Sequence, residues 1–122
     1  MNAPLEEPMA ENKIAYLELP ASNVAALKDF YGKLFGWEFQ DWGPDYAAFS
    51  QAGLEGGFNG DAASKTKAPL AVIETTEIEA MQERIAAEGG TITVPIFAYP
   101  GGRRFHFVDP AGNELAVMQS GE

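Results

Sequence analysis

The sequence predicts an α+β domain that contains two copies of a strand-helix-strand-strand-strand module. The same order of elements occurs twice, and a polar stretch separates the two copies. Short segments of the halves can be superimposed: Ile14–Leu19 on Leu70–Thr75, and Ala48–Ser50 on His106–Val108. Each half is too small to bury a sheet by itself. We therefore expect the two βαβββ modules to form a curved sheet cup, with the helices outside.

The first module is expected over residues 13–60, after a disordered tail over residues 1–12 that contains several glutamates. Its helix is predicted by apolar residues that recur every three or four positions. Ser22 or Asn23 can cap this helix, and Gly36 can end it. The strand before the helix and the three after it are expected at Lys13–Leu19, Trp37–Gln40, Tyr46–Gln51 and Leu54–Phe58.

The second module is expected over residues 70–119, after a polar linker over residues 61–69. Thr76 and Glu79 have the spacing of a capping box and predict the start of its helix. Pro95 is expected to end the strand that follows this helix. The expected strands are Leu70–Thr75, Thr91–Val94, Arg104–Val108 and Glu114–Gln119.

The composition excludes several classes of function. The 122 residues include no cysteine and one histidine, so disulfides, thiolate metal sites and cysteine nucleophiles are excluded. The formal net charge of -10 would repel nucleic acid. This charge either keeps the protein soluble or attracts cationic ligands. No apolar run approaches the roughly 20 residues of a membrane span, and the acidic N-terminus is unlike a signal peptide. We expect a cytoplasmic protein with neither a membrane nor a nucleic acid as partner.

Three local motifs, in the same order as the elements, carry a family resemblance. Phe30-Tyr31 is followed by Leu34-Phe35-Gly36-Trp37 and Phe39, Gly89-Gly90 precedes a strand, and Phe107–Asn113 contains an Asp-Pro-Ala-Gly-Asn turn. Together with the repeated module, these motifs resemble the vicinal-oxygen-chelate superfamily of glyoxalases, bleomycin-resistance proteins and extradiol dioxygenases. The resemblance extends from Ile14 to Gln119 and implies the fold, whereas function must be argued from a site.

In metal-bearing members of that superfamily, the first and last strands of each module supply the metal ligands. The resemblance places these positions at Ile14 and Leu70 on the first strands, and at Gly57 (or Gly56) and Ala116 on the last strands. None of these side chains has a lone pair for a cation. The chain is therefore predicted to bind no metal, and no other cofactor is implied.

Carboxylates close to these positions leave a second hypothesis open. Glu18, Glu74 and Glu114 either are solvated residues or partners of Arg103 and Arg104, or they form an acidic rim that binds an organic or metallic cation. His106 is either a hydrogen-bonded core residue or, if it faces the cup, the one candidate for a general base. The predicted ligand pocket comprises Tyr16, Glu18, Trp42, Tyr46, Phe58, Glu74, Tyr99, Arg104 and Glu114.

The resemblance and the missing ligands favour a metal-independent binding protein for a small cationic or aromatic molecule, similar to the bleomycin-resistance branch. Two alternatives remain. One is a metal-dependent enzyme of the lyase or dioxygenase type, and the other is a non-catalytic interaction module. Catalysis is the less favoured hypothesis, because chemistry in this superfamily depends on a metal ion. Members of the family usually pair, so we expect a homodimer.

Overall fold

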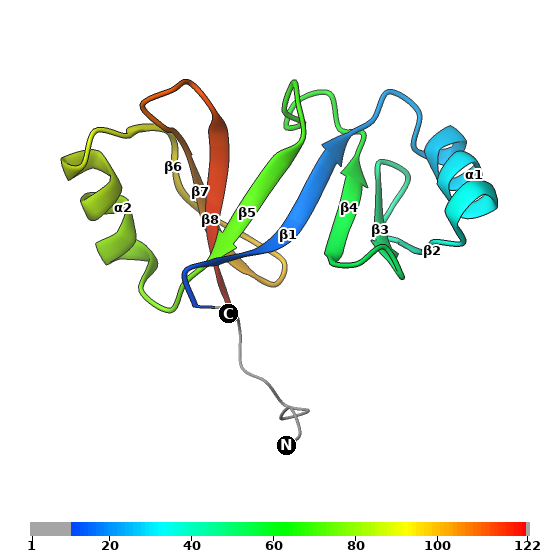
Figure 1. The fold of residues 1–122 in the computed structure, drawn as a ribbon, viewed down its shortest axis with the longest axis horizontal. Helices are drawn as coiled ribbons and strands as arrows, with labels where there is room; N and C mark the ends of the chain where they lie inside the picture. The colour runs from blue at the N-terminus through cyan, green and yellow to red at the C-terminus, as the bar shows by residue number, and fades with distance from the viewer. Residues whose placement is uncertain (1–10, 122) are drawn as a thin grey trace, which may run out of the picture. The chain divides into compact units, whose positions relative to one another are not determined.

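The computed structural model describes residues 11–121, so that most of the predicted N-terminal tail lies outside the described residues. The described residues divide into two compact units, one formed by Tyr16–Ala71 and the other by residues 72–121 together with residues 11–15. The first module contains β1 (Lys13–Pro20), α1 (Val24–Phe35), β2 (Glu38–Asp41), β3 (Tyr46–Ser50) and β4 (Glu55–Asn59) (Figure 1). The second contains β5 (Leu70–Glu74), α2 (Ile78–Ala87), β6 (Thr91–Tyr99), β7 (Gly102–Val108) and β8 (Glu114–Ser120).

The strand order within each module confirms the predicted α+β class and the repeat. In the first module the order is β2-β3-β4-β1, and in the second it is β6-β7-β8-β5. The three strands after each helix form antiparallel pairs, and the last of them pairs in parallel with the strand that precedes the helix. The two modules therefore have the same topology.

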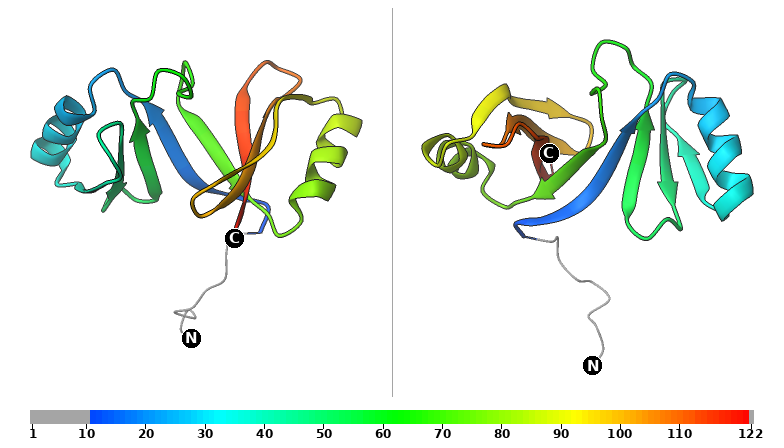
Figure 2. Two further views of the ribbon diagram at one scale, coloured as in Figure 1. Left: turned by 180° about the vertical axis from the view of Figure 1, so that it is seen from behind. Right: turned by 45° about the horizontal axis from the view of Figure 1, so that its top comes forward.

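Helix α1 packs on one face of the first module's sheet (Figures 1 and 2). Asn23 caps the helix, because its side chain accepts a hydrogen bond from the amide of Ala26, and Gly36 ends it in the left-handed conformation with a φ of 76°. The core under the helix is aromatic: the rings of Tyr31 and Trp37 stack at 4.7 Å between centroids. Its buried members are Ala21, Phe49 and Phe58, and Leu19, Val24, Leu27, Tyr31, Trp37, Phe39 and Ala52 pack against them.

Helix α2 packs in the same way on one face of the strands of the second module. Phe105 and Phe107 of β7 and Val117 of β8 point to the helix, where Ile78 is fully buried. Because side chains alternate along a strand, the residues between them point to the opposite face. This alternation determines which side chains can form a site.

Two details of the second module differ from the sequence-based expectation. The predicted capping box of Thr76 and Glu79 is wrong: Glu77 is the N-cap residue and its side chain makes no capping hydrogen bond. The side chain of Gln119 in β8 instead accepts a hydrogen bond from the amide of Ile78 at 3.0 Å. Pro95 does not end its strand either, because β6 continues to Tyr99 through two register shifts at the edge of the sheet.

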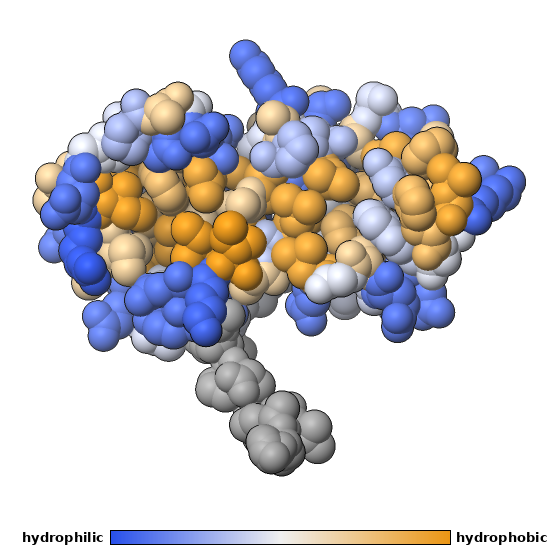
Figure 3. Space-filling view, viewed as in Figure 1, coloured by the Kyte–Doolittle hydropathy of each residue, from blue (hydrophilic) through white to orange (hydrophobic). Residues whose placement is uncertain are grey.

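No helix in the described part of the chain is long and apolar enough to cross a membrane. Helix α1 nevertheless exposes large apolar side chains. The residues concerned are Phe30, Leu34 and Phe35. Figure 3 shows apolar surface in the region of α1.

Candidate functional site

In the first module, a polar cluster occupies the sheet face opposite α1. Tyr16 and Glu18 alternate along β1 with Leu17 and Leu19, and Leu19 packs towards the helix. Tyr46 alternates along β3 with buried Ala47 and therefore points to the same face as Glu18. Three of the predicted pocket residues thus lie together.

Hydrogen bonds connect the members of this cluster. The Tyr46 hydroxyl donates to Oε2 of Glu18 at 3.0 Å and lies 2.6 Å from the Tyr16 hydroxyl. Because Tyr46 has one proton, which it donates to the carboxylate, Tyr16 is the donor in the contact between the two hydroxyls. Glu18 is only 4% exposed, so its carboxylate depends on these protein hydrogen bonds in place of water.

The position of Tyr46 also explains why glycine occurs at position 57. The last-strand residue Gly57 pairs with Glu18 on one side and with Ala48 on the other. A Cβ atom built on Gly57 would lie 2.5 Å from the Tyr46 hydroxyl and 2.6 Å from a carbon of its ring. The Tyr46 side chain therefore fills the space into which any other side chain at position 57 would extend.

Burial and the nearby Glu18 carboxylate raise the pKa of Tyr46 far above its usual value of about 10. The folded state therefore keeps a proton that the unfolded chain loses above pH 10 or so. We expect the free energy of unfolding to fall above that pH, by at most about 1.4 kcal/mol per pH unit from this group. The phenolate absorbance of Tyr46 should appear only as the protein unfolds.

The control for this titration is Tyr46→Phe, which removes the ionising group and leaves the ring. The variant should lose about 1–3 kcal/mol of stability at neutral pH, because the buried Glu18 carboxylate loses a donor. The fall in stability above pH 10 should be smaller in this variant, because it lacks the Tyr46 phenol. Ionisation of all four tyrosines in the folded wild-type protein would contradict the assignment.

In the second module, His106 faces away from α2. Its neighbours Phe105 and Phe107 belong to the core under the helix, so the imidazole points to the other face of β7. His106 is 4% exposed, and its Nδ1 lies 2.9 Å from Oε2 of Glu114 in β8. The structure thus combines the two alternatives for His106, because the side chain is buried and hydrogen-bonded but lies on the face opposite the helix.

Aromatic and cationic side chains surround His106 on this face. The Phe97 ring of β6 lies 6.1 Å from the imidazole and 6.3 Å from the Tyr99 ring, measured between centroids. The Arg104 guanidinium carbon lies 5.7 Å from the centroids of both Phe97 and Tyr99, as in a cation–π contact. The Tyr99 hydroxyl also contacts the sulfur of Met118 at 3.9 Å.

Phe58 and Trp42 of the predicted pocket lie elsewhere. Phe58 is fully buried under α1, because it alternates with Gly57 along β4 and so points to the helix side. Trp42 is exposed in the turn between β2 and β3. Glu74 instead lies on the face of the second module opposite α2, because it alternates along β5 with Ile73 of the core under that helix. It is buried and accepts a hydrogen bond from the Ser120 hydroxyl at 2.8 Å.

Among the described residues, Arg103 forms its ion pair with Glu79 and not with Glu18, Glu74 or Glu114. Its guanidinium forms an ion pair with Glu79 in the first turn of α2, and this hydrogen bond holds the pKa of the Glu79 carboxyl below its usual range. Both groups are exposed, so the pair adds little to stability.

Two features of these faces depend on details that the sequence pattern does not show. Phe97 was expected only as one of several aromatic residues near loops that could line an apolar pocket, and its place on β6 was not, because the strand was expected to end at Pro95. The role of Tyr46 at Gly57 was also missed, although paired glycines in a strand indicate a close approach by another group.

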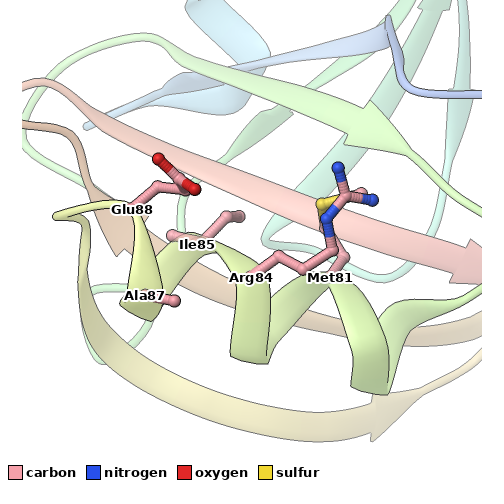
Figure 4. A pocket seen from close by; sticks show the side chains of 5 residues that line it. All are labelled: Met81, Arg84, Ile85, Ala87 and Glu88. Atoms are coloured by element: carbon pink, nitrogen blue, oxygen red, sulfur yellow. The ribbon is translucent and has the colours of Figure 1, made fainter.

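A shallow hollow of about 300 Å³ also lies along α2 (Figure 4). Its lining comes from this one helix and includes none of the predicted pocket residues. The lining residues are Met81, Arg84, Ile85, Ala87 and Glu88.

Comparisons with solved structures support the fold. A Legionella pneumophila protein described as an NAD-dependent benzaldehyde dehydrogenase aligns with a TM-score of 0.72 and 18% identity, over 87% of this chain and 98% of its own. A Vibrio splendidus member of the glyoxalase/bleomycin resistance protein/dioxygenase superfamily gives 0.67 and 17%, over 86% and 97%. The Mn(II)-bound glyoxalase of Novosphingobium aromaticivorans gives 0.63 and 20%, over 89% of this chain and 39% of its own. Such low identities support the fold alone.

The sequence gives no match to curated proteins. A family model, however, matches residues 13–117, which include both modules almost completely. The repeated topology and this match agree, and the chain belongs to the glyoxalase/bleomycin resistance protein/dioxygenase superfamily.

Proposed function

We propose that the chain is a metal-independent binding protein for a small molecule, similar to the bleomycin-resistance branch of its superfamily. The observation that carries the proposal is the Tyr46 side chain, which fills the space beside Gly57 where a ligating side chain of the last strand would extend. The two hydroxyls of Tyr16 and Tyr46 are hydrogen-bonded to each other, and Tyr46 donates to Glu18.

The strand registers support this proposal, because they align the two modules residue by residue. Ala48 lies opposite Gly57, and His106 lies opposite Ala116. On its other side Gly57 lies beside Glu18, whereas Ala116 lies beside Val72.

Tyr16 lies two residues before Glu18, the partner of Gly57, and Leu70 lies two residues before Val72, the partner of Ala116. This alignment makes Tyr16 the counterpart of Leu70. The sequence overlay had instead placed Ile14 there. The positions expected to ligate a metal then carry one phenol and three side chains without a donor. A phenol is a poor ligand while protonated, and the one phenol present is hydrogen-bonded to Tyr46.

Metal content and thermal stability test the proposal together. We expect less than one metal ion per chain in the purified protein and a melting temperature that a chelator leaves unchanged. A small aromatic or cationic ligand at about 100 times its Kd should stabilise the protein by about 2.7 kcal/mol without added metal. That corresponds to roughly 10 °C in melting temperature for a domain of this size.

A stoichiometric ion whose removal lowers the melting temperature would overturn the proposal. In that case Glu18, Glu74, Glu114 and His106 would become the candidate ligands, and the metal-dependent enzyme would be favoured.

Pairing of two chains remains part of the proposal. The exposed apolar side chains Phe30, Leu34 and Phe35 of α1 are compatible with a covered surface. Sedimentation of the purified protein should give the mass of a homodimer, whereas a monomer would favour the interaction-module alternative.

A further inference from the structure

We propose that His106 and Glu114 form a metal-independent proton acceptor, and that its ligand is a weakly acidic aromatic molecule, a phenol. This inference rests on the proposed binding function and names the class of ligand for the second module. Its residues all lie on the face of that module opposite α2.

The hydrogen bond to Glu114 determines the tautomer of His106. An ionised carboxylate only accepts hydrogen bonds, so Nδ1 of the imidazole must carry the proton in the 2.9 Å contact. In the neutral imidazole, Nε2 then holds the lone pair and can only accept. Within residues 11–121, no recorded hydrogen bond or ion pair involves Nε2. A complementary ligand therefore presents a hydrogen-bond donor.

The surroundings of His106 can stabilise the ring after it gains a proton. Glu114 is the charged group in contact with the imidazole, and its carboxylate compensates the charge of an imidazolium. The neighbours opposite His106, Val94 on β6 and Ala116 on β8, are apolar. Arg104, which shares the face of β7, directs its guanidinium to the rings of Phe97 and Tyr99.

The aromatic side chains favour a planar ligand. The Phe97 ring is inclined by 34° to the imidazole, with centroids 6.1 Å apart, and Phe97 is 36% exposed. A ring placed against Phe97 would gain the stacking energy typical of aromatic pairs. A hydroxyl on the edge of such a ring is the simplest group that brings a donor to the imidazole.

The proton transfer is balanced within the complex. The O–H bond of the phenol breaks, its electron pair remains on oxygen, and an N–H bond forms at Nε2. The products are a phenolate and an imidazolium that is hydrogen-bonded to Glu114. No oxidant, reductant or metal ion takes part. The same proton returns when the ligand dissociates.

The probe for the test is 4-nitrophenol, because its absorbance reports whether it is protonated. Its methyl ether, 4-nitroanisole, has the same ring and lacks the proton. We expect 4-nitrophenol to bind about tenfold more tightly or better, since a hydrogen bond to an ionised group is lost in the ether. The bound phenol should also show the phenolate band at a pH where the free compound is mainly protonated.

Two variants assign this effect to the dyad. His106→Gln and Glu114→Gln should both remove the phenolate band of bound 4-nitrophenol, while 4-nitroanisole binding changes less than twofold. The matched control is Glu83→Gln on the exposed surface of α2, which removes the same charge far from the β7 contact. This control should keep the phenolate band.

A spectroscopic measurement on the wild-type protein makes the test independent of variant folding. His106 is the one histidine, so long-range proton–nitrogen NMR spectra show a single imidazole. We expect the Nδ1–H tautomer in the free protein and protonation of both nitrogens with 4-nitrophenol. Equal affinity for the phenol and its ether, no binding of either, or the Nε2–H tautomer would overturn the dyad. The metal-free binding function would still stand if another ligand raised the melting temperature.

Discussion

Gly56→Ala is expected to reduce the free energy of unfolding by about 3 kcal/mol. A Cβ atom at position 56 would lie 2.2 Å from the backbone carbonyl oxygen of Leu17 and 2.4 Å from a carbon of the Phe49 ring. Leu17 and Gly56 are register partners in the parallel ladder between β1 and β4. The carbonyl cannot move without breaking that ladder, so the strands themselves must separate. Urea unfolding followed by tryptophan fluorescence measures the loss.

Gly57→Ala is the matched control on the neighbouring residue. Its Cβ would meet the Tyr46 side chain in place of backbone, so rotation of Tyr46 can relieve the contact. We expect a smaller loss, about 1–2 kcal/mol, from the hydrogen bonds that Tyr46 makes with Tyr16 and Glu18. The variant should also let Tyr46 ionise at a lower pH. A larger loss for Gly57→Ala than for Gly56→Ala would show that the two close approaches were assigned to the wrong residues.

Phe105→Ala is expected to reduce stability by about 3–5 kcal/mol. Phe105 is fully buried beneath α2, where it belongs to the same core as Ile78, Phe107 and Val117. Removal of the ring leaves a cavity that neither the strand nor the helix can close. The midpoint of urea unfolding should fall without a large change in the slope, since the folded state stays compact.

Phe97→Ala is the control for this prediction and also bears on the site. Phe97 lies on the opposite face of the same sheet and is partly exposed, so its loss should lower stability by about 1 kcal/mol or less. It should nevertheless weaken the binding of 4-nitrophenol, because it removes the ring beside His106. If Phe97→Ala were as destabilising as Phe105→Ala, then Phe97 would be a core residue and not part of a binding surface.

Much of the fold could be predicted, because it depends on patterns that are local in sequence. The spacing of apolar residues between Val24 and Phe35 gave α1 with its correct ends, and Asn23 and Gly36 gave its caps. The repeated order of elements gave the module and its topology. The start of α2 could not be predicted in this way, because the group that caps it is Gln119, which lies 41 residues away in the chain.

The site was predictable only in part, because it depends on strand register. Alternation along one strand correctly placed Tyr16 with Glu18, and His106 opposite Phe105 and Phe107. Which residues of neighbouring strands meet depends on pairing, and pairing is not visible in local patterns. The contact between His106 and Glu114, and that between Tyr46 and Gly57, are examples of this kind.

The side chain of Tyr46 has a consequence for how this chain could change during evolution. A carboxylate at position 57 would collide with Tyr46, and loss of Tyr46 alone would remove a hydrogen-bond donor from the buried Glu18 carboxylate. Each substitution alone is therefore harmful, whereas the pair together would open the last strand to a ligating side chain. Such coupling between contacting residues is strongly non-additive. Acquisition of a metal ligand at this position thus requires two coordinated substitutions, and this epistasis acts as a barrier that retains the present form of the site.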